Sequence, residues 1–95
     1  MYGILRTKGF LRSYRKLEKS GVLTAKLRDE VEEVVRVLSE GKKLSADYSD
    51  HTLKGVWLGF RECHIRGDLL LVYQIVEDRL VLVLADIGSH SYLFG

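Results

Sequence analysis

Two stretches in the first half of the chain carry apolar residues at helical spacing. In the first, Phe10, Tyr14 and Leu17 recur at intervals of four and three residues, and Lys or Arg occupies most of the positions between them. Thr7 can cap the start of such a helix, and Gly21 can end it in the left-handed conformation that glycine adopts at low cost. The pattern predicts an amphipathic helix from Thr7 to Gly21.

A second helix is predicted from Thr24 to about Glu40. Gly41 follows its last turn, and its apolar stripe consists of Leu27, Val31, Val34 and Leu38. Because only a few residues separate the two helices, we expect them to form an antiparallel hairpin. The apolar residues 2–6 precede both helices and predict a short strand.

The second half of the chain changes to strand character. Residues 42–55 show no sustained period and are rich in Ser, Asp and Gly, which is typical of a loop. Three apolar runs follow, with tight turns at Arg66-Gly67 and around Glu77-Asp78, and they cover residues 56–65, 68–76 and 79–87. We expect an α+β fold in which these strands form an antiparallel sheet, the last two lie centrally, and the helical hairpin packs on one side.

The composition is that of a globular protein. The 95 residues are 46% hydrophobic and 29% charged, so we expect a single domain over residues 1–95 and exclude a two-domain enzyme and a disordered chain. So small a core leaves room only for a shallow active site. Cys63 is the one cysteine, no apolar run is long enough to cross a bilayer, and the first residues lack the features of a signal peptide. A cytoplasmic protein without membrane attachment is expected.

Charge is concentrated at the front of the chain. Residues 1–28 contain eight Lys or Arg and one acid, whereas residues 29–50 contain three and seven and residues 51–95 contain four and five. A dense positive face attracts phosphate backbones or an acidic partner. A solvated helix surface is an equally good interpretation, so charge alone leaves both open.

All three histidines lie in the second half, each near the end of a predicted element. Imidazoles near their ordinary pKa can take a proton from an RNA 2′-OH or give one to the leaving 5′ oxygen, and nearby cations can stabilise the phosphoryl oxygens. Single histidines in small domains are more often structural, so the spacing alone does not establish a site. The candidates are His51, His64 and His90, with Asp68 across the turn from His64 and with Lys54 and Arg61 nearby.

A metal site is not favoured by the sequence. There is no HExxH or CxxC spacing and only one thiol. Cys63 alternates with His64 along a predicted strand, so it should face the other side of the sheet and belong to the core. Tyr73 and Phe60 suit the packing surface, and Trp57 either packs there as well or flanks the site as a stacking surface for a base.

Beyond these patterns, the chain resembles a known family. The stretch YSDHTLKGVWLGFRECHIRGDLLLVYQI (48–75) and the closing GSHSYLFG (88–95) resemble the YafQ branch of the RelE-type toxins, which are ribosome-dependent mRNA interferases of bacterial toxin–antitoxin systems. LRTKGFLRSYRKLEKSG and LSEGKKL in the first half are similar to the same family. Each motif is short, but their order and spacing together are specific.

The resemblance implies a small microbial-RNase-like fold, with an N-terminal strand and a helical hairpin packed on an antiparallel sheet. It implies an endoribonuclease that cuts translated mRNA in the ribosomal A site with histidines and an aspartate, using no metal or other cofactor. The implied partners are a cognate antitoxin, the ribosome and mRNA, with promoter DNA bound only through the antitoxin complex. The basic first helix, including Arg12, Arg15 and Lys16, would contact RNA or hold an acidic antitoxin segment.

When the family's motifs are matched to this sequence, the resemblance implies the catalytic residues His51, His64, Asp68, His90 and Phe94. We expect His90 to be the general acid, His64 or Asp68 to be the base, and His51 to be a second proton carrier or a phosphate contact. Phe94 would stack on or orient a base. Lys54 and Arg61 are candidates for binding phosphate, although Arg61 can equally pair with Glu62 or another acid and be structural.

One position departs from the family pattern. Many members of the family carry an arginine two residues before the glycine of GSH, where this chain has Asp86. An acid there would repel the scissile phosphate if it faced the site. The alternative function is therefore a weakened or catalytically silent homologue that binds an antitoxin and acts in a DNA-binding repressor complex.

Overall fold

The computed structural model describes all of residues 1–95. Its helices are α1 (Lys8–Lys19), α2 (Ala25–Ser39) and the short α3 (His90–Phe94). Its strands are β1 (Gly3–Arg6), β2 (His51–Thr52), β3 (Arg61–Arg66), β4 (Leu69–Val76) and β5 (Val81–Gly88). The predicted strand before the first helix and both long helices are confirmed. No helix is long and apolar enough to cross a membrane.

The strands form one sheet of five in the order β1-β5-β4-β3-β2. The meander β3-β4-β5 is antiparallel as expected, and β4 and β5 are central. No partner was predicted for the N-terminal strand; it joins one edge of the sheet, where β1 pairs in parallel with β5. A parallel neighbour requires a long crossover connection, and the chain between β1 and β5 contains both long helices and the rest of the sheet.

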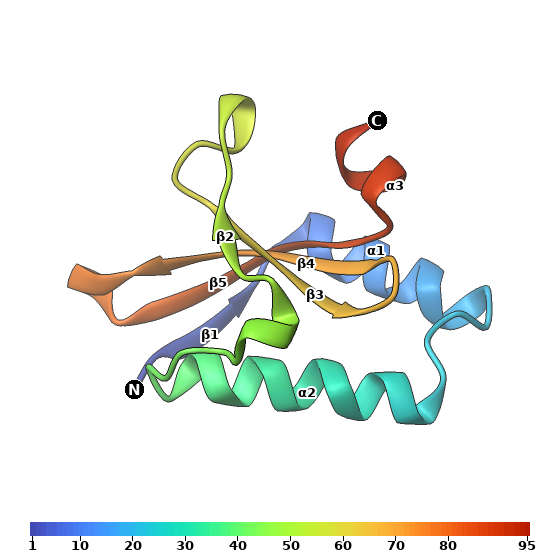
Figure 1. The fold of residues 1–95 in the computed structure, drawn as a ribbon, viewed down its shortest axis with the longest axis horizontal. Coiled ribbons are helices and arrows are strands. Elements are labelled where there is room, and N and C mark those ends of the chain that lie inside the picture. Colours follow the sequence, from blue (N-terminus) through green and yellow to red (C-terminus); the bar gives the residue numbers. More distant parts are fainter.

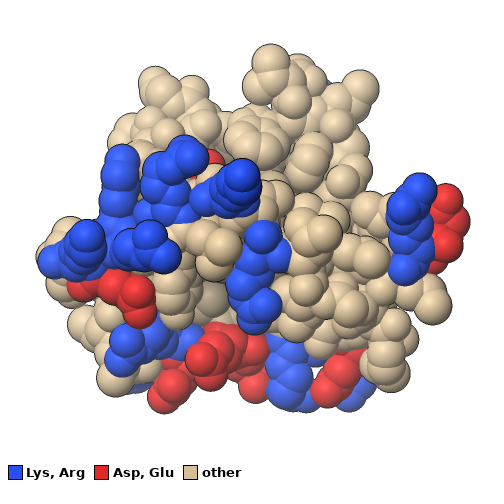
Figure 2. Space-filling model, turned by 180° about the vertical axis from the view of Figure 1, so that it is seen from behind, with Lys and Arg blue, Asp and Glu red and all other residues tan.

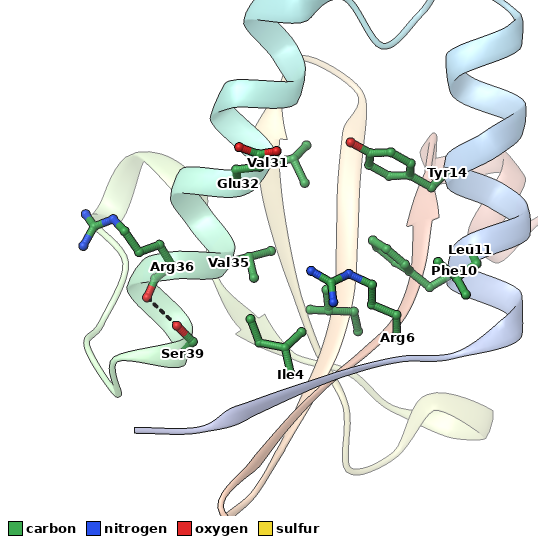
Figure 3. Close-up of a pocket in the computed structure, with 11 residues that line it drawn as sticks. Ile4, Arg6, Phe10, Leu11, Tyr14, Val31, Glu32, Val35, Arg36 and Ser39 are labelled. Carbon is green, nitrogen blue, oxygen red and sulfur yellow. Dashed lines mark hydrogen bonds between the residues drawn. The ribbon is translucent and has the colours of Figure 1, made fainter.

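The two long helices run antiparallel and pack on one face of the sheet (Figures 1 and 3), which confirms the predicted hairpin. Each is capped by a threonine: Thr7 Oγ1 accepts a hydrogen bond from the Phe10 N–H at 3.0 Å, and Thr24 Oγ1 accepts one from the Leu27 N–H at 3.2 Å. Gly21, at φ 80°, follows the first helix in the left-handed conformation. The helices are nevertheless splayed, and a hollow of about 450 Å³ lies between them, lined by side chains such as Phe10, Tyr14, Val31 and Val35 (Figure 3).

The main core lies between the helices and the sheet. Its helix side chains include Phe10, Val34 and Leu38, and its sheet side chains include Cys63, Ile65, Leu71, Tyr73, Leu82, Leu84 and Ile87. Leu70 and Val72 alternate with these along β4 and are also buried, but they lie outside the helix-side cluster. They therefore face the other side of the sheet, from which α3 and the segment between β2 and β3 rise (Figure 1).

The first strand of the meander is shorter than predicted. Residues 56–60 do not continue β3; a 3-10 helix, η2 (Gly55–Trp57), is followed by a turn. Gly55 at φ 66° and Gly59 at φ 94° adopt left-handed conformations that are incompatible with a strand. The apolar Val56 and Leu58, which suggested a strand, are 96% and 76% exposed on a projecting loop.

The segment predicted as a loop also contains a strand. The pairing of β2 with β3 places His51 opposite Glu62 and Thr52 opposite Arg61. His51 is thus held by the sheet rather than by an irregular loop. This two-residue strand was too short to show a period in the sequence.

Candidate active site on the open face of the sheet

Two histidines converge on one buried carboxylate. His51 Nε2 lies 3.2 Å from Glu62 Oε1, and His64 Nε2 lies 3.5 Å from the same oxygen. Glu62 is only 4% exposed, whereas both imidazoles are about half exposed. The cause is strand geometry: His51 is the cross-strand partner of Glu62, and His64 follows Glu62 by two residues and so shares its face. These side chains alternate with the core residues Cys63 and Ile65, so they point away from the helices.

The other ring nitrogen of His51 is also engaged. Its Nδ1 lies 2.8 Å from the backbone carbonyl oxygen of Ser49. Both nitrogens therefore face oxygen acceptors, and both contacts are hydrogen bonds only when each nitrogen carries a proton. Glu62 and Ser49 together orient the His51 ring.

The second group of candidate residues gathers around α3. The Asp68 carboxylate, in the turn between β3 and β4, accepts a hydrogen bond from the backbone N–H of His90 at 3.1 Å. Ser89 Oγ caps the same helix by accepting from the Tyr92 N–H at 3.1 Å. Asp68 thus anchors the first residue of α3. The structure brings Asp68 and His90 together, although the contact is with the backbone of His90 and not with its imidazole.

Aromatic side chains connect α3 to the loop that carries η2. The ring centroids of His90 and Phe94 are 5.2 Å apart, those of Phe94 and Trp57 are 6.4 Å apart, and those of Trp57 and Phe60 are 5.4 Å apart. Trp57 therefore lies beside the candidate site, as one of the two sequence interpretations proposed. Phe60, which was expected on the packing surface of the sheet, belongs to this row. The site is open, since His51 and His90 are exposed and His64 is partly exposed.

Arg61 lies on the other side of the sheet. It alternates with Glu62, and its Nε lies 3.2 Å from Asp50 Oδ1. The same oxygen accepts a hydrogen bond from the buried Tyr73 hydroxyl at 2.7 Å, and burial together with this carboxylate raises the pKa of Tyr73 above its ordinary value. The structural alternative considered for Arg61 is the one observed, with Asp50 as the acid. Its candidate role in binding phosphate is not supported, because its charge is neutralised away from the histidines.

The other candidate cations form no ion pairs. Lys54 immediately precedes η2 on the loop beside the site, is exposed and has no carboxylate within salt-bridge distance. Arg12, Arg15 and Lys16 are exposed on α1 and form no ion pair. Figure 2 shows Lys and Arg gathered over α1 on the back of the molecule, with Asp and Glu concentrated along α2. The patch borders α3, since the Lys16 ammonium lies 5.7 Å from the centre of the Tyr92 ring.

Cys63 belongs to the core, as expected. It has no exposed surface, and burial is the main cause that raises the pKa of its thiol to about 12. A thiol that stays protonated at neutral pH is not a nucleophile.

Sequence reasoning missed Glu62 as a member of the site. The available signal was the spacing Glu-Cys-His at 62–64, which places a carboxylate and an imidazole on the same face of a strand. The pairing with His51 was not predictable, because β2 itself was not predicted. Asp50 was missed for the same reason.

Comparison with known proteins supports one family over the whole chain. Residues 2–95 match the family described as the bacterial toxin of type II toxin–antitoxin systems, YafQ. A putative toxin YafQ of Haemophilus influenzae is 58% identical over 36 residues, which are 37% of this chain and 35% of that protein. The mRNA interferase toxin YafQ of Escherichia coli K12 is 38% identical over 52 residues, or 55% of this chain and 54% of that protein. The aligned stretches thus span about a third to a half of these relatives.

Solved structures match the complete fold. A metal-bound toxin from Helicobacter pylori is 42% identical, with a TM-score of 0.86 over 99% of this chain and 100% of that one. YafQ in the E. coli DinJ-YafQ complex is 24% identical, with a TM-score of 0.84 over the full length of both chains, and shows the same fold.

The metal seen in the H. pylori protein raises the question of whether this chain has a comparable site. No group of three or more His, Cys, Asp or Glu side chains is arranged to hold a metal ion here. The Nε2 atoms of His51 and His64 both face the Glu62 carboxylate. These three side chains are not arranged as ligands of one metal ion. With its fold, its terminal GSHSYLFG motif and the match over residues 2–95 all in agreement, this chain belongs to the YafQ family of toxins of type II toxin–antitoxin systems.

Proposed function

We propose that this protein is a ribosome-dependent endoribonuclease that cleaves translated mRNA in the A site by acid–base catalysis. The observation that carries the proposal is the convergence of His51 and His64 on the buried Glu62, on the face of the sheet from which α3 brings His90. Family membership and the name of the E. coli relative, an mRNA interferase toxin, support the same reaction class.

In the proposed reaction, the RNA 2′-oxygen attacks the adjacent phosphorus while the bond from phosphorus to the 5′ oxygen breaks. His64 takes the 2′-OH proton, and Glu62, 3.5 Å from its Nε2, stabilises the imidazolium that forms. His90 gives a proton to the leaving 5′ oxygen. The products are a 2′,3′-cyclic phosphate and a 5′-OH end, with no net consumption of protons.

The remaining candidate residues support this chemistry. His51, oriented by Glu62 and by the Ser49 carbonyl, serves as a second proton carrier or a phosphate contact, and the exposed Lys54 supplies a cation. Asp68 holds the first residue of α3 and therefore acts on His90 through the backbone rather than as the base. Phe94 and Trp57 provide aromatic faces on which a base of the mRNA can stack.

The proposed partners fit the distribution of charge. Ribosomal RNA, contacted independently of sequence, suits the exposed cations Arg12, Arg15 and Lys16 on α1, none of which forms an ion pair. A cognate antitoxin is proposed as the inhibitor, since E. coli YafQ forms a complex with DinJ. Promoter DNA would be bound through that antitoxin complex, and the toxin would act in the cytoplasm, where translation occurs.

The test is cleavage of a defined mRNA by the purified protein, with and without translating ribosomes, with the cut ends mapped by primer extension. We expect cuts at A-site codons only when ribosomes are present. His64→Ala and His90→Ala should fold normally and lose cleavage. Retained cleavage in both variants would overturn the site.

The catalytically silent alternative depended on Asp86 facing the phosphate. The structure instead places the Asp86 carboxylate against α1, 2.6 Å from Ser13 Oγ. The electrostatic objection is thereby removed, although the family's arginine remains absent. If the folded wild-type protein cleaves nothing on ribosomes but binds its antitoxin, the silent alternative replaces our proposal.

A further inference from the structure

We propose that Asp86, Ser13 and Tyr92 form a positioning network that sets the placement of α3, and with it His90, relative to the rest of the site. The inference rests on the proposed function, because it concerns the residue assigned there as the general acid. None of the three residues touches the reacting atoms, so each is a positioning residue.

The network joins three elements that are distant in the sequence. Ser13 on α1 is only 3% exposed, and its Oγ lies 2.6 Å from Asp86 Oδ1 on β5 and 2.9 Å from the Tyr92 hydroxyl on α3. Asp86 Oδ1 also accepts a hydrogen bond from the Ile87 N–H at 2.9 Å. A buried hydroxyl thus connects the strand that leads into α3 with the helix itself.

The direction of these hydrogen bonds follows from their chemistry. An ionised carboxylate can only accept, so the single proton of the Ser13 hydroxyl is donated to Asp86. The lone pairs of Ser13 Oγ are then available, and the Tyr92 hydroxyl donates to them. Because one proton position depends on the next, removal of either hydroxyl interrupts the link between α1 and α3.

The Tyr92 ring is also held by packing. A Cβ at Gly88 would lie 2.6 Å from Tyr92 Cδ2, so the ring rests directly on the backbone at the end of β5. The Lys16 ammonium lies 5.7 Å from the centre of the same ring and adds a cation–π contact. The aromatic side chain is therefore fixed by the strand, by Ser13 and by Lys16.

A helix of five residues needs such support. So short a segment is not stable by itself, and its position depends on its tertiary contacts. Asp68 and Ser89 hold its first turn. Tyr92 is the one side chain of α3 that is hydrogen-bonded to α1. His90 and Phe94 contact each other, and Phe94 contacts Trp57, so these two residues of α3 lie on the side of the candidate site. The network consequently fixes the side of α3 that lies away from the site.

This arrangement gives a physical role to the departure from the family pattern. The pairing of β4 with β5 shifts by one residue between Val72 and Tyr73, which leaves Ala85 without a partner next to Asp86. At this irregularity the Asp86 carboxylate reaches Ser13 rather than the histidines. An acid in place of an arginine thus serves to anchor α3.

The test compares Tyr92→Phe, which removes only the hydroxyl, with Tyr2→Phe as a matched control. The Tyr2 hydroxyl likewise donates a hydrogen bond, to Glu77 Oε1 at 2.8 Å, but on an exposed part of the protein with no hydrogen bond to α3. We expect Tyr92→Phe to lower kcat about tenfold with KM unchanged, because a general acid displaced by a fraction of an ångström transfers its proton poorly. The NMR signals of the His90 ring should shift, while those of His51 and His64 should not.

Ser13→Ala breaks the same link and should give the same loss, and the double variant Ser13→Ala/Tyr92→Phe should lose no more than either single variant. Wild-type kcat and unchanged His90 signals in Tyr92→Phe would overturn the proposal, as would additive losses in the double variant. If the wild-type protein cleaves no RNA, the proposed function fails, whereas the His90 signals still test the network.

Discussion

The Nε2 atom of His51 lies 3.2 Å from the Oε1 atom of Glu62, across the pair of strands β2 and β3. The Glu62 carboxylate is almost completely buried, so little water can stabilise a charge on it. The contacts with His51 and His64 take the place of that water. A buried carboxylate between two exposed imidazoles is a suitable partner for a positive charge that appears on either ring during proton transfer.

Glu62→Gln should reduce cleavage about 100-fold, since a neutral amide cannot stabilise an imidazolium as a carboxylate does. Cleavage of ribosome-bound mRNA in single turnovers measures the effect. Glu33→Gln is the control, because Glu33 pairs with Arg36 on the exposed face of α2. Equal rates for the two variants would show that Glu62 has no part in the reaction.

Tyr73→Phe should destabilise the protein by about 1–3 kcal/mol, because it removes a buried hydrogen bond to the Asp50 carboxylate. Urea denaturation followed by circular dichroism gives the free energy of unfolding. Asp50 directly precedes His51, so some loss of cleavage should accompany the loss of stability. Tyr2→Phe, which removes an exposed bond to Glu77, should leave both quantities close to wild type.

Cys63 should make stability depend on pH in the alkaline range. Its pKa is raised from 9.0 to about 12 in the folded protein, so the folded state retains the thiol proton at pH values where the unfolded chain loses it. The stabilisation is complete below pH 9 and is lost as the pH rises toward 12, at up to about 1.4 kcal/mol per pH unit.

The free energy of unfolding measured from pH 8 to pH 10 should therefore begin to fall near pH 9 in the wild type. In Cys63→Ala the fall should begin later, when tyrosines start to ionise. A native thiol that reacts with an aromatic disulfide reagent at pH 8 as fast as in urea would contradict this account.

Lys54→Ala should weaken RNA binding without changing stability, whereas Arg61→Ala should lower stability with little effect on RNA binding. Lys54 is exposed beside the site and unpaired, so its loss should raise KM for RNA and leave the free energy of unfolding unchanged. Arg61 pairs with Asp50 on the helix side, so its loss should lower stability, measured by thermal melting, with little effect on RNA binding. If Arg61→Ala instead binds RNA more weakly and is as stable as the wild type, Arg61 is a phosphate contact after all.

The basic patch on α1 should control the salt dependence of ribosome binding. Replacing Arg12, Arg15 and Lys16 with Gln should reduce the slope of log affinity against log salt by about 2, if each cation contacts one phosphate. Sedimentation with ribosomes at several salt concentrations measures this slope. The control replaces Lys42 and Lys43 with Gln, which removes positive charge after α2 rather than on α1. An unchanged slope in the α1 variant would assign the patch to solubility.

Local patterns were sufficient for the elements with strong periods. The helical spacing of Phe10, Tyr14 and Leu17 identified α1, and Thr7 and Thr24 cap the helices as their chemistry indicated. The apolar runs of β4 and β5 identified the central strands. The same reasoning was wrong over residues 56–60, where apolar composition suggested a strand but two glycines in left-handed conformations form a loop.

The sequence by itself determined which side chains were available: three histidines, one buried thiol and a chain with a basic front, arranged in motifs that resemble one family. Only the tertiary structure decided which of them meet. The pairing of β2 with β3 joins His51 to Glu62, and the contact of α1 with α3 turns Asp86 from a residue that would repel phosphate into an anchor. Such contacts depend on strand register and on packing between segments distant in the chain, and neither leaves a period that a local pattern can reveal.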